Sequence, residues 1–312
     1  MAMVVQNDAE TIERALRSFY RHVEAIVVTT DPARGWSGVP VEPDETLRII
    51  RTVDTDKKTH ILEGDFFRFA DPLKNETYQR QRTVDILTSR VKGLDWICQI
   101  DADEEFLDFT AVLAVLEELP RRVRCLRWCL IPLFRKLADG RYLTVVDSHE
   151  AKPFLEGFYL GHRPGARMIS ARMPALLNLP LSRQTLRLNA LLVGLNRWTR
   201  LIRDCRLEGV CTQRTAVLHY SYAKSEWRVK EKLRTFGHTA EFDHEGFLEL
   251  WRKAETSWRD IRDFHPTLPG LWPALRPFAL DDLRTGDSPR AEAVGYGEPP
   301  SGSSTRQSDL AK

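Results

Sequence analysis

An apolar run that ends on carboxylates constrains the fold of this chain more than any other stretch. The run covers residues 95–100, and four carboxylates follow it within five positions: Asp101, Asp103, Glu104 and Glu105. Its apolar residues are typical of a buried strand in a parallel sheet. In an open α/β sheet, ligands bind at the carboxyl ends of the parallel strands. The run therefore predicts a buried strand that presents acidic side chains to a binding site.

The crowding of these carboxylates has two interpretations. Like charges this close repel one another, and a divalent cation such as Mg²⁺ or Mn²⁺ relieves the repulsion because it takes oxygen ligands. The alternative is an acidic helix N-terminus, since Asp and Glu stabilise the first turn and residues 106–119 are typical of a helix. Asp-X-Asp is a short motif, so by itself it leaves both interpretations open.

Length and charge limit the classes of protein to which this chain can belong. With 312 residues, of which 42% are hydrophobic, it can bury a full core as one large domain. Lys and Arg number 46 against 44 Asp and Glu, and the net charge of +2 gives no reason to expect a nucleic-acid partner. The five cysteines are an odd number without the tight pairs of a zinc site, so we expect reduced thiols.

The sequence predicts a cytoplasmic protein. No signal peptide opens it, and no apolar run reaches the ~18 residues of a membrane-spanning helix. Residues 181–204 combine leucines at helical spacing with arginines on the opposite side. That composition suits a membrane-surface helix, with peripheral contact through residues 183–203, and it also suits an ordinary packed helix, which is commoner.

Strands and helices alternate through the first hundred residues. The predicted strands are residues 3–5, 24–30, 59–63 and 97–100, and the predicted helices are residues 8–22, 44–53 and 75–92. Polar residues follow the strands: Asn7, Asp31, Asp65 and Asp101. The alternation predicts an α/β fold, Rossmann-like, with a mostly parallel sheet flanked by helices. The first strand is not followed by Gly-X-Gly-X-X-Gly, and the chain lacks a Gly-Lys-Ser/Thr loop, which argues against dinucleotide and P-loop sites.

These patterns together resemble the nucleotide-sugar-binding half of GT-A glycosyltransferases, above all those of the family 2 type. The resemblance rests on residues 6–12 before an amphipathic helix, on strands that end at Asp31 and Asp65, and on residues 95–106. It covers roughly residues 3–110.

The resemblance returns later in the chain and also has departures. Residues 219–225 are similar to a His-Tyr-X-X-X-Lys-Ser segment of related bacterial sequences. The chain differs in its shortened start, in Asp8 where the family more often has Glu, and in the long loop after Asp31.

The resemblance implies an enzyme that moves a sugar from a UDP- or GDP-linked donor to the hydroxyl of a carbohydrate, lipid-linked or small-molecule acceptor. Residues 1–110 would bind the donor. Family members bind base and ribose at the first three strand ends, which implies contacts from Asn7, Asp31 and Asp65. Asp101 would face ribose or metal, and Asp103 would hold Mn²⁺ or Mg²⁺ as a Lewis acid on the leaving diphosphate. Turn chemistry explains Asp31 and Asp65 equally well.

We expect residues 111–265 to form the acceptor half of the same domain, with a mixed sheet and a helical C-terminal part. Residues 124–132 and 142–146 are typical of strands. Asp147 and Glu150 follow the second strand, where an inverting transferase needs a carboxylate to take the proton of the acceptor hydroxyl. A surface turn explains Asp147 equally well.

Basic side chains and histidines complete the expected site. Lys152 and Lys224 are candidate contacts to the diphosphate. His219 follows the apolar residues 216–218 and fits the late segment of the family, so it is the candidate second metal ligand, with His162 as its competitor.

The end of the chain changes character. Residues 266–284 are Pro-rich and predict a strap, and residues 285–312 are Gly, Pro, Ser and charge, which predicts a disordered tail. Two other functions stay open: a non-catalytic sugar-nucleotide or carbohydrate-binding protein of the same fold, and a metal-dependent phosphoryl-transfer enzyme, since an acidic strand end suits that chemistry too.

Overall fold

The structure is a computed structural model that describes residues 1–121, 123–147, 152–175, 210–239, 241 and 243–286. Three expectations lie outside the described residues: the candidate base Glu150, the membrane contact at residues 183–203, and the tail from residue 287 onward.

The first half of the chain forms a parallel sheet. It contains β1 (Ala2–Val4), α1 (Ile12–Phe19), η1 (Tyr20–His22), β2 (Ile26–Thr30), α2 (Thr46–Val53), β3 (Thr59–Glu63), α3 (Pro72–Arg90) and β4 (Ile97–Asp101). The strands lie parallel in the order β3-β2-β1-β4. The register pairs Val4 of β1 with Thr29 of β2 and with Asp101 of β4, so the carboxyl ends meet at one edge.

Alternating side chains divide this sheet into two packed faces. Met3 and Ile100 belong to a core shared with α1, α2 and α4 (Phe109–Glu118). Ala2 and Ile97, which point to the opposite side, pack with α3. Helices therefore cover both faces, as a doubly wound α/β fold requires.

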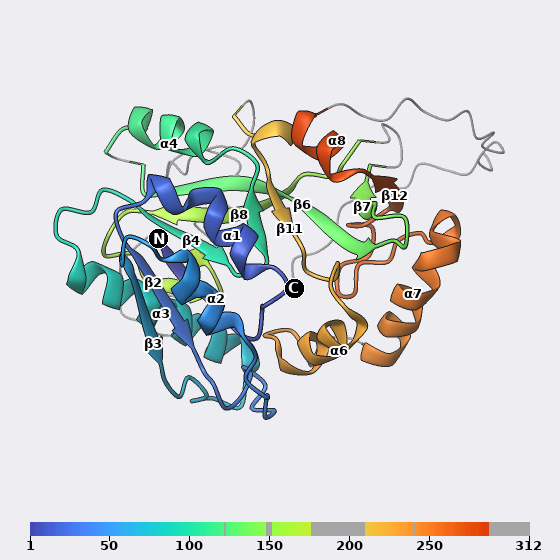
Figure 1. Ribbon diagram of the computed structural model, residues 1–312, viewed down its shortest axis with the longest axis horizontal. Helices are drawn as coiled ribbons and strands as arrows, with labels where there is room; N and C mark the ends of the chain where they lie inside the picture. The colour runs from blue at the N-terminus through green and yellow to red at the C-terminus, as the bar shows by residue number, and fades with distance from the viewer. Residues whose placement is uncertain (122, 148–151, 176–209, 240, 242, 287–312) are drawn as a thin grey trace, which may run out of the picture.

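The second half continues the sheet in mixed sense (Figure 1). Its elements are β5 (Glu104–Phe106), α4, β6 (Cys125–Lys136), β7 (Tyr142–Val146), β8 (Glu156–His162), β9 (Met168–Ser170), β10 (Met173–Pro174), η2 (Gln213–Thr215), β11 (Val217–His219), α6 (Glu226–Thr235), α7 (His244–Ser257), η3 (Trp258–Asp260), β12 (Ala274–Phe278) and α8 (Leu280–Thr285). Antiparallel pairs join β4, β8, β6, β7 and β12, whereas β11 lies parallel to β6 and antiparallel to β5. Helices α6 and α7 pack together against β7.

The predicted fold class is confirmed: an α/β protein with a parallel sheet flanked by helices, then a mixed half with a helical C-terminal part. The acidic helix N-terminus is wrong, because β5 contains Glu104 and Glu105 and α4 begins only at Phe109, capped by Asp108. The Pro-rich strap contains a strand that the sequence did not predict, β12, and Phe278 at its end is buried.

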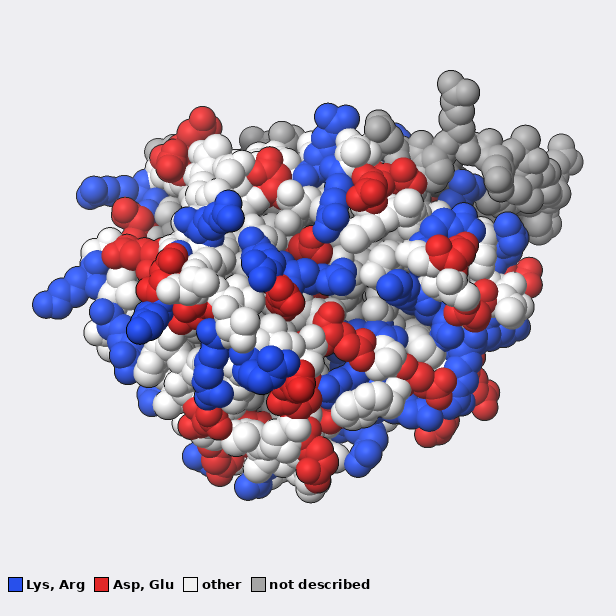
Figure 2. Space-filling model, viewed as in Figure 1, with Lys and Arg blue, Asp and Glu red and all other residues white. Residues whose placement is uncertain are grey.

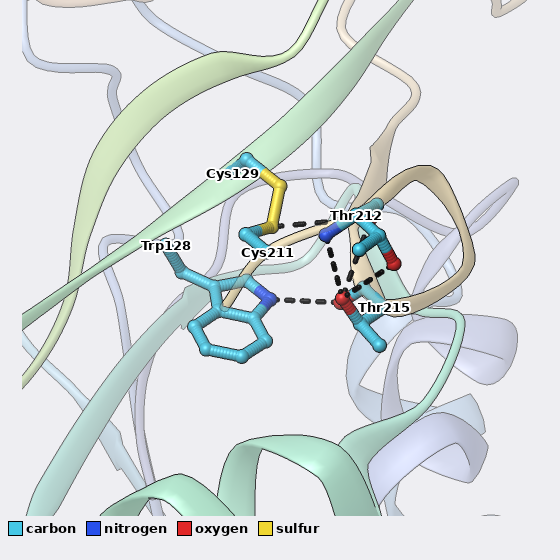
Figure 3. The surroundings of a disulfide bond; sticks show 5 residues. All are labelled: Trp128, Cys129, Cys211, Thr212 and Thr215. Carbon is cyan, nitrogen blue, oxygen red and sulfur yellow. Dashed lines mark hydrogen bonds between the residues drawn. A yellow bond between two sulfur atoms is a disulfide. The ribbon is translucent and has the colours of Figure 1, made fainter. Parts of the chain in front are cut away.

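A disulfide between Cys129 and Cys211 corrects the expectation of reduced thiols. The two cysteines are 82 positions apart in the chain, and their Cα atoms are 6.1 Å apart. Figure 3 shows the bond beside Trp128, whose indole N–H donates to the carbonyl of Thr215 at 2.8 Å. The bond joins β6 to the segment that precedes β11. The two segments are close because β11 pairs with β6. Cys98 and Cys125 are buried and take no part in this disulfide.

Charged side chains are mixed over the molecular surface. Figure 2 shows Lys and Arg interspersed with Asp and Glu over the face that it presents. Among the residues that the structure describes, no helix is both long and apolar enough to cross a bilayer.

Candidate functional site

A cavity lies at the carboxyl ends of β1 and β4, next to α6. It contains about 710 Å³ of empty space, including solvent at its mouth. Its lining comes from residues 4–8 after β1, residues 35–36 in the loop after β2, residues 101–103 after β4, and residues of α6 and its two flanks. This is the sheet edge at which the sequence predicted a ligand.

Asp101, at the end of β4, is held by a buried arginine from α3. Arg80 is 3% exposed and donates to both carboxylate oxygens of Asp101, at 2.8 and 3.0 Å, while its Nε donates to Glu76 at 2.9 Å. Burial alone would raise the pKa of the Asp101 carboxyl, but Arg80, assisted by Arg172, outweighs burial and lowers that pKa. Asp101 is therefore an ionised, rigidly placed carboxylate.

Asp103 is the centre of the site. Its Oδ2 accepts from the ammonium groups of Lys224 and Lys232, each at 3.0 Å, while its Oδ1 lies 3.6 Å from Nε2 of His219. Burial alone would raise the pKa of the Asp103 carboxyl, but the two lysines outweigh it and hold that pKa well below its usual range. Lys224 also donates to Asp8 at 2.8 Å.

Strand β11 delivers the late segment to Asp103. β11 pairs antiparallel with β5, with His219 opposite Glu104, and the backbone N–H of Tyr220 then donates to the carbonyl of Asp103 at 2.8 Å. Lys224 comes a few residues further on, just before α6. Lys232 lies on α6 itself. Burial lowers the pKa of the His219 imidazole more than Asp103 raises it, so the ring is neutral near pH 7.

Asp103 and His219 are the two side chains of this site that could act together as ligands of a divalent cation. Their facing atoms, Oδ1 and Nε2, are too far apart for a hydrogen bond at 3.6 Å. Adjacent ligands of one octahedral ion, each about 2.1 Å from it, are about 3 Å apart. A carboxylate and a neutral imidazole are both metal ligands. Within the described ranges, no cluster of three or more His, Cys, Asp or Glu side chains suits a metal, so a bound ligand would have to complete the coordination.

The other two carboxylates of the acidic run have protein partners. Glu104 is fully buried and accepts from both terminal nitrogens of Arg172, at 2.6 and 2.7 Å. Glu105 accepts from the hydroxyl of Tyr220 at 2.8 Å and from Arg284 at 2.7 Å. Neither Glu104 nor Glu105 lines the cavity, and both lie in β5 directly after Asp103.

Of the predicted donor contacts, Asn7 and Asp101 line the cavity. Asn7 has a positive φ of 45°, a conformation that Asn tolerates better than most residues, and its amide donates to Glu231 at 3.0 Å. Asp31 is buried and accepts from the backbone N–H groups of residues 33, 34 and 66. Asp65 is exposed and bonds Arg68 at 2.6 Å. Turn chemistry thus describes the observed contacts of Asp31 and Asp65, and neither side chain lines the cavity.

The candidates of the acceptor half lie elsewhere. Asp147 follows β7, where its N–H donates to the carbonyl of Lys152 at 3.2 Å, and neither residue lines the cavity. His162 pairs with Ile97 at the start of β4, at the opposite end of that strand from Asp103. The structure thus brings His219 to Asp103 and places His162 away from it.

Several residues of the site were missed in the sequence. Arg80 and Arg172 neutralise the acidic run, and Trp36 lines the cavity from the loop after β2. Glu156 on β8 does not line the cavity, but burial raises the pKa of its carboxyl, and Arg172 and Glu104 are among its charged neighbours. In the sequence Arg80 is one of several basic residues within the predicted helix at residues 75–92, and only the tertiary structure shows that it is buried and meets Asp101.

Comparisons with known proteins add little to this description. No protein-family model and no curated protein matches the chain. A crystal structure of S. aureus TarS is similar at 14% identity and a TM-score of 0.29, covering 52% of this chain and 28% of that one. A crystal structure of S. aureus TarS 1-349 is similar at 14% identity and a TM-score of 0.36, covering 83% and 74%. With TM-scores below 0.5, these similarities support no functional assignment.

Proposed function

We propose that this protein is a glycosyltransferase. It binds a nucleoside-diphosphate sugar in the cavity and moves the sugar to an acceptor hydroxyl, with Mn²⁺ or Mg²⁺ between Asp103 and His219. One observation supports this most: Asp103 faces a neutral imidazole with one oxygen and two ammonium groups with the other. Two possible metal ligands, Asp103 and His219, therefore lie beside two ammonium groups that could bind phosphate.

The charge of the cavity favours a ligand that arrives with a cation. Its lining holds four carboxylates, from Asp8, Asp101, Asp103 and Glu231, and three cationic side chains, from Lys224, Arg228 and Lys232. Arg80 neutralises Asp101 from behind the lining, so a bare diphosphate would meet no excess of positive groups among these side chains. A diphosphate together with a divalent cation is close to neutral, so the pair suits this cavity better than either ion alone.

The residues of this chain then have separate roles in the proposed reaction. When bound, the metal would act as a Lewis acid on the leaving diphosphate. Lys224 and Lys232 lie within hydrogen-bond distance of Asp103 and would donate to phosphate oxygens as charge grows there. Asp101, held by Arg80, would accept from a ribose hydroxyl.

The acceptor hydroxyl needs a base, and Glu156 is a candidate beside Asp147 and Glu150. Glu156 pairs with Leu130 at the start of β8, and it shares a face of β8 with Phe158. The guanidinium of Arg172, which bonds Glu104, lies 4.6 Å from the ring centre of Phe158. Glu156 thus borders the acidic end of the sheet, and its raised pKa suits a general base.

A product assay tests the function against its two rivals. The protein is incubated with Mn²⁺ and a panel of UDP- and GDP-linked sugars, and the released phosphates are separated. Release of the nucleoside diphosphate, dependent on acceptor, is the expected result. Release of a nucleoside monophosphate or inorganic phosphate would indicate phosphoryl transfer. Thermal stabilisation without any release would indicate a binding protein; a ligand at 100 times its Kd adds about 2.7 kcal/mol.

A further inference from the structure

We propose that Trp36 is the nucleobase-binding wall of the cavity. On this view the base of the nucleotide stacks on the indole ring, while the diphosphate lies toward Lys224 and Lys232. The inference rests on the proposed function and adds to it the direction in which the nucleotide lies. It concerns the loop after Asp31, the part of the donor half in which the sequence departs from the family that it resembles.

The polar groups of Trp36 are already used inside the protein. Its indole N–H donates to Oε1 of Gln79 at 2.6 Å, and its carbonyl accepts from the side chain of Asn75 at 2.8 Å. Gln79 is buried and in turn donates to the carbonyl of Thr29 on β2 at 3.1 Å. The indole side chain therefore has only ring surface left to offer to a ligand in the cavity. Ring surface offers a platform on which a nucleobase can stack, whereas it gives a phosphate no hydrogen bond.

The loop that carries Trp36 is held from the side of α3. Asn75 is fully buried and uses its whole amide: it accepts from the N–H groups of Arg68 and Phe69 and donates to the carbonyls of Trp36 and Phe69. Asp31 fixes the start of the same loop through the N–H groups of residues 33 and 34. A wall that is already ordered loses little entropy when a ligand binds.

The same loop also packs directly on α6. A Cβ atom on Gly35 would lie 2.4 Å from Cβ of Thr235, so no other residue fits at this position without displacing the loop or the helix. Next to it, the hydroxyl of Ser37 donates to the carbonyl of Arg234 at 2.6 Å. Trp36 is thus clamped between α3 and α6.

The cavity lining has two chemically different kinds of surface. Trp36, Gly35, Val4 and Val5 supply uncharged surface to the lining, whereas Asp103, Lys224 and Lys232 supply charged groups. A nucleotide is also divided into an uncharged aromatic base and an anionic diphosphate. The base therefore suits the uncharged ring of Trp36, and the anionic diphosphate suits the two lysines.

The experiment compares a nucleotide with a ligand that lacks the base. Dissociation constants for UDP, GDP and inorganic pyrophosphate are measured by calorimetry with Mg²⁺ present, on the wild-type protein and on Trp36→Leu, Trp36→Phe and Trp227→Leu. Both Trp36 variants lose the bond to Gln79, so the difference between Phe and Leu reports the ring alone. Trp227 is 53% exposed, lies on α6 and is outside the cavity lining, which makes it the matched control.

We expect Trp36→Leu to weaken the better-bound nucleotide at least ~10-fold and pyrophosphate less than ~2-fold, because only the nucleotide has a base that stacks on the ring. Trp36→Phe should keep most of the affinity, and Trp227→Leu should match the wild type. Equal losses for nucleotide and pyrophosphate, or no loss in Trp36→Leu, would overturn the inference and leave the proposed function intact. A wild-type protein that binds pyrophosphate but neither nucleotide would overturn both.

Discussion

The ammonium nitrogen of Lys224 lies 3.0 Å from Oδ2 of Asp103, a residue 121 positions earlier in the chain. Lys224 is nearly buried and bonds Asp8 as well, so it joins the ends of β1 and β4 to the start of α6. Burial alone would lower the pKa of the Lys224 ammonium, but Asp103 and Asp8 raise it, so the group stays charged. A single side chain therefore connects the two halves of the proposed site.

The first prediction concerns Asp103. Asp103→Asn keeps the shape of the side chain but removes the charge that Lys224 and Lys232 neutralise. We expect Mn²⁺-dependent binding of a nucleoside diphosphate to be lost. The free energy of unfolding should fall by about 3 kcal/mol, because two ammonium groups lose a buried partner. Calorimetry and urea unfolding measure the two effects. Metal-dependent affinity that survives in the folded variant would contradict the prediction.

The second prediction separates the two histidines. His219→Ala should weaken Mn²⁺ affinity in the presence of nucleoside diphosphate by at least ~10-fold, since Nε2 of His219 faces Oδ1 of Asp103. His162→Ala is the control and should leave Mn²⁺ affinity unchanged, because His162 pairs with the far end of β4. If only His162→Ala loses metal, the assignment is reversed, and if neither variant does, no histidine of this pair binds the metal.

The third prediction is a pH dependence of stability that originates at His162. Its Nδ1–H donates to the carbonyl of Arg163 at 3.0 Å, and burial lowers the pKa of the ring to about 4. In the unfolded chain the pKa is about 6.5. Between these values the unfolded state binds a proton that the folded state does not, so stability falls as pH falls, by up to about 1.4 kcal/mol per pH unit.

The measurement for His162 is urea unfolding of the wild type and of His162→Gln at pH 7.5, 6.5 and 5.5. Gln is neutral throughout, so the variant lacks this pH dependence. Below pH 6.5 the wild type should therefore lose more unfolding free energy than the variant does. A difference that is the same at all three pH values would show that His162 titrates alike in both states.

The fourth prediction concerns the disulfide. Reduction of Cys129–Cys211 should lower the free energy of unfolding by about 2–4 kcal/mol, because the bond restricts the unfolded chain across a separation of 82 residues. Urea unfolding with and without reductant measures the effect. The control is the double variant Cys129→Ser, Cys211→Ser, on which reductant should have no effect. If reductant does not change the unfolding of the wild type, the bond does not form in solution.

The fifth prediction concerns the base. If Glu156 takes the acceptor proton, Glu156→Gln lowers kcat by ~10²-fold or more while KM for the donor changes little. Asp147→Asn is the matched control from the same half of the chain, and its kcat should stay near that of the wild type. A large loss in Asp147→Asn instead, with normal Glu156→Gln, would return the role to the residue that the sequence first suggested.

The parallel half of this protein could be predicted from local sequence patterns. Periods of two and of 3.6 residues encode strands and helices locally, so the predicted strands at residues 24–30 and 59–63 are close to or identical with β2 and β3. Parallel strands with aligned registers bring their carboxyl ends together, and for that reason the polar residues after β1 and β4 could be expected at one site. Asn7, Asp101 and Asp103 do line one cavity.

The partners that those residues meet depend on contacts between segments far apart in the sequence. β11 lies between β5 and β6 because of pairings far apart in the sequence, and no local pattern encodes them. That placement brings His219 and Lys224 to Asp103 and Cys211 to Cys129. The repulsion among the four carboxylates was read from the sequence as a sign of metal, yet buried arginines and lysines neutralise most of it. Charge balance depends on distance in space, which residue spacing along the chain does not measure.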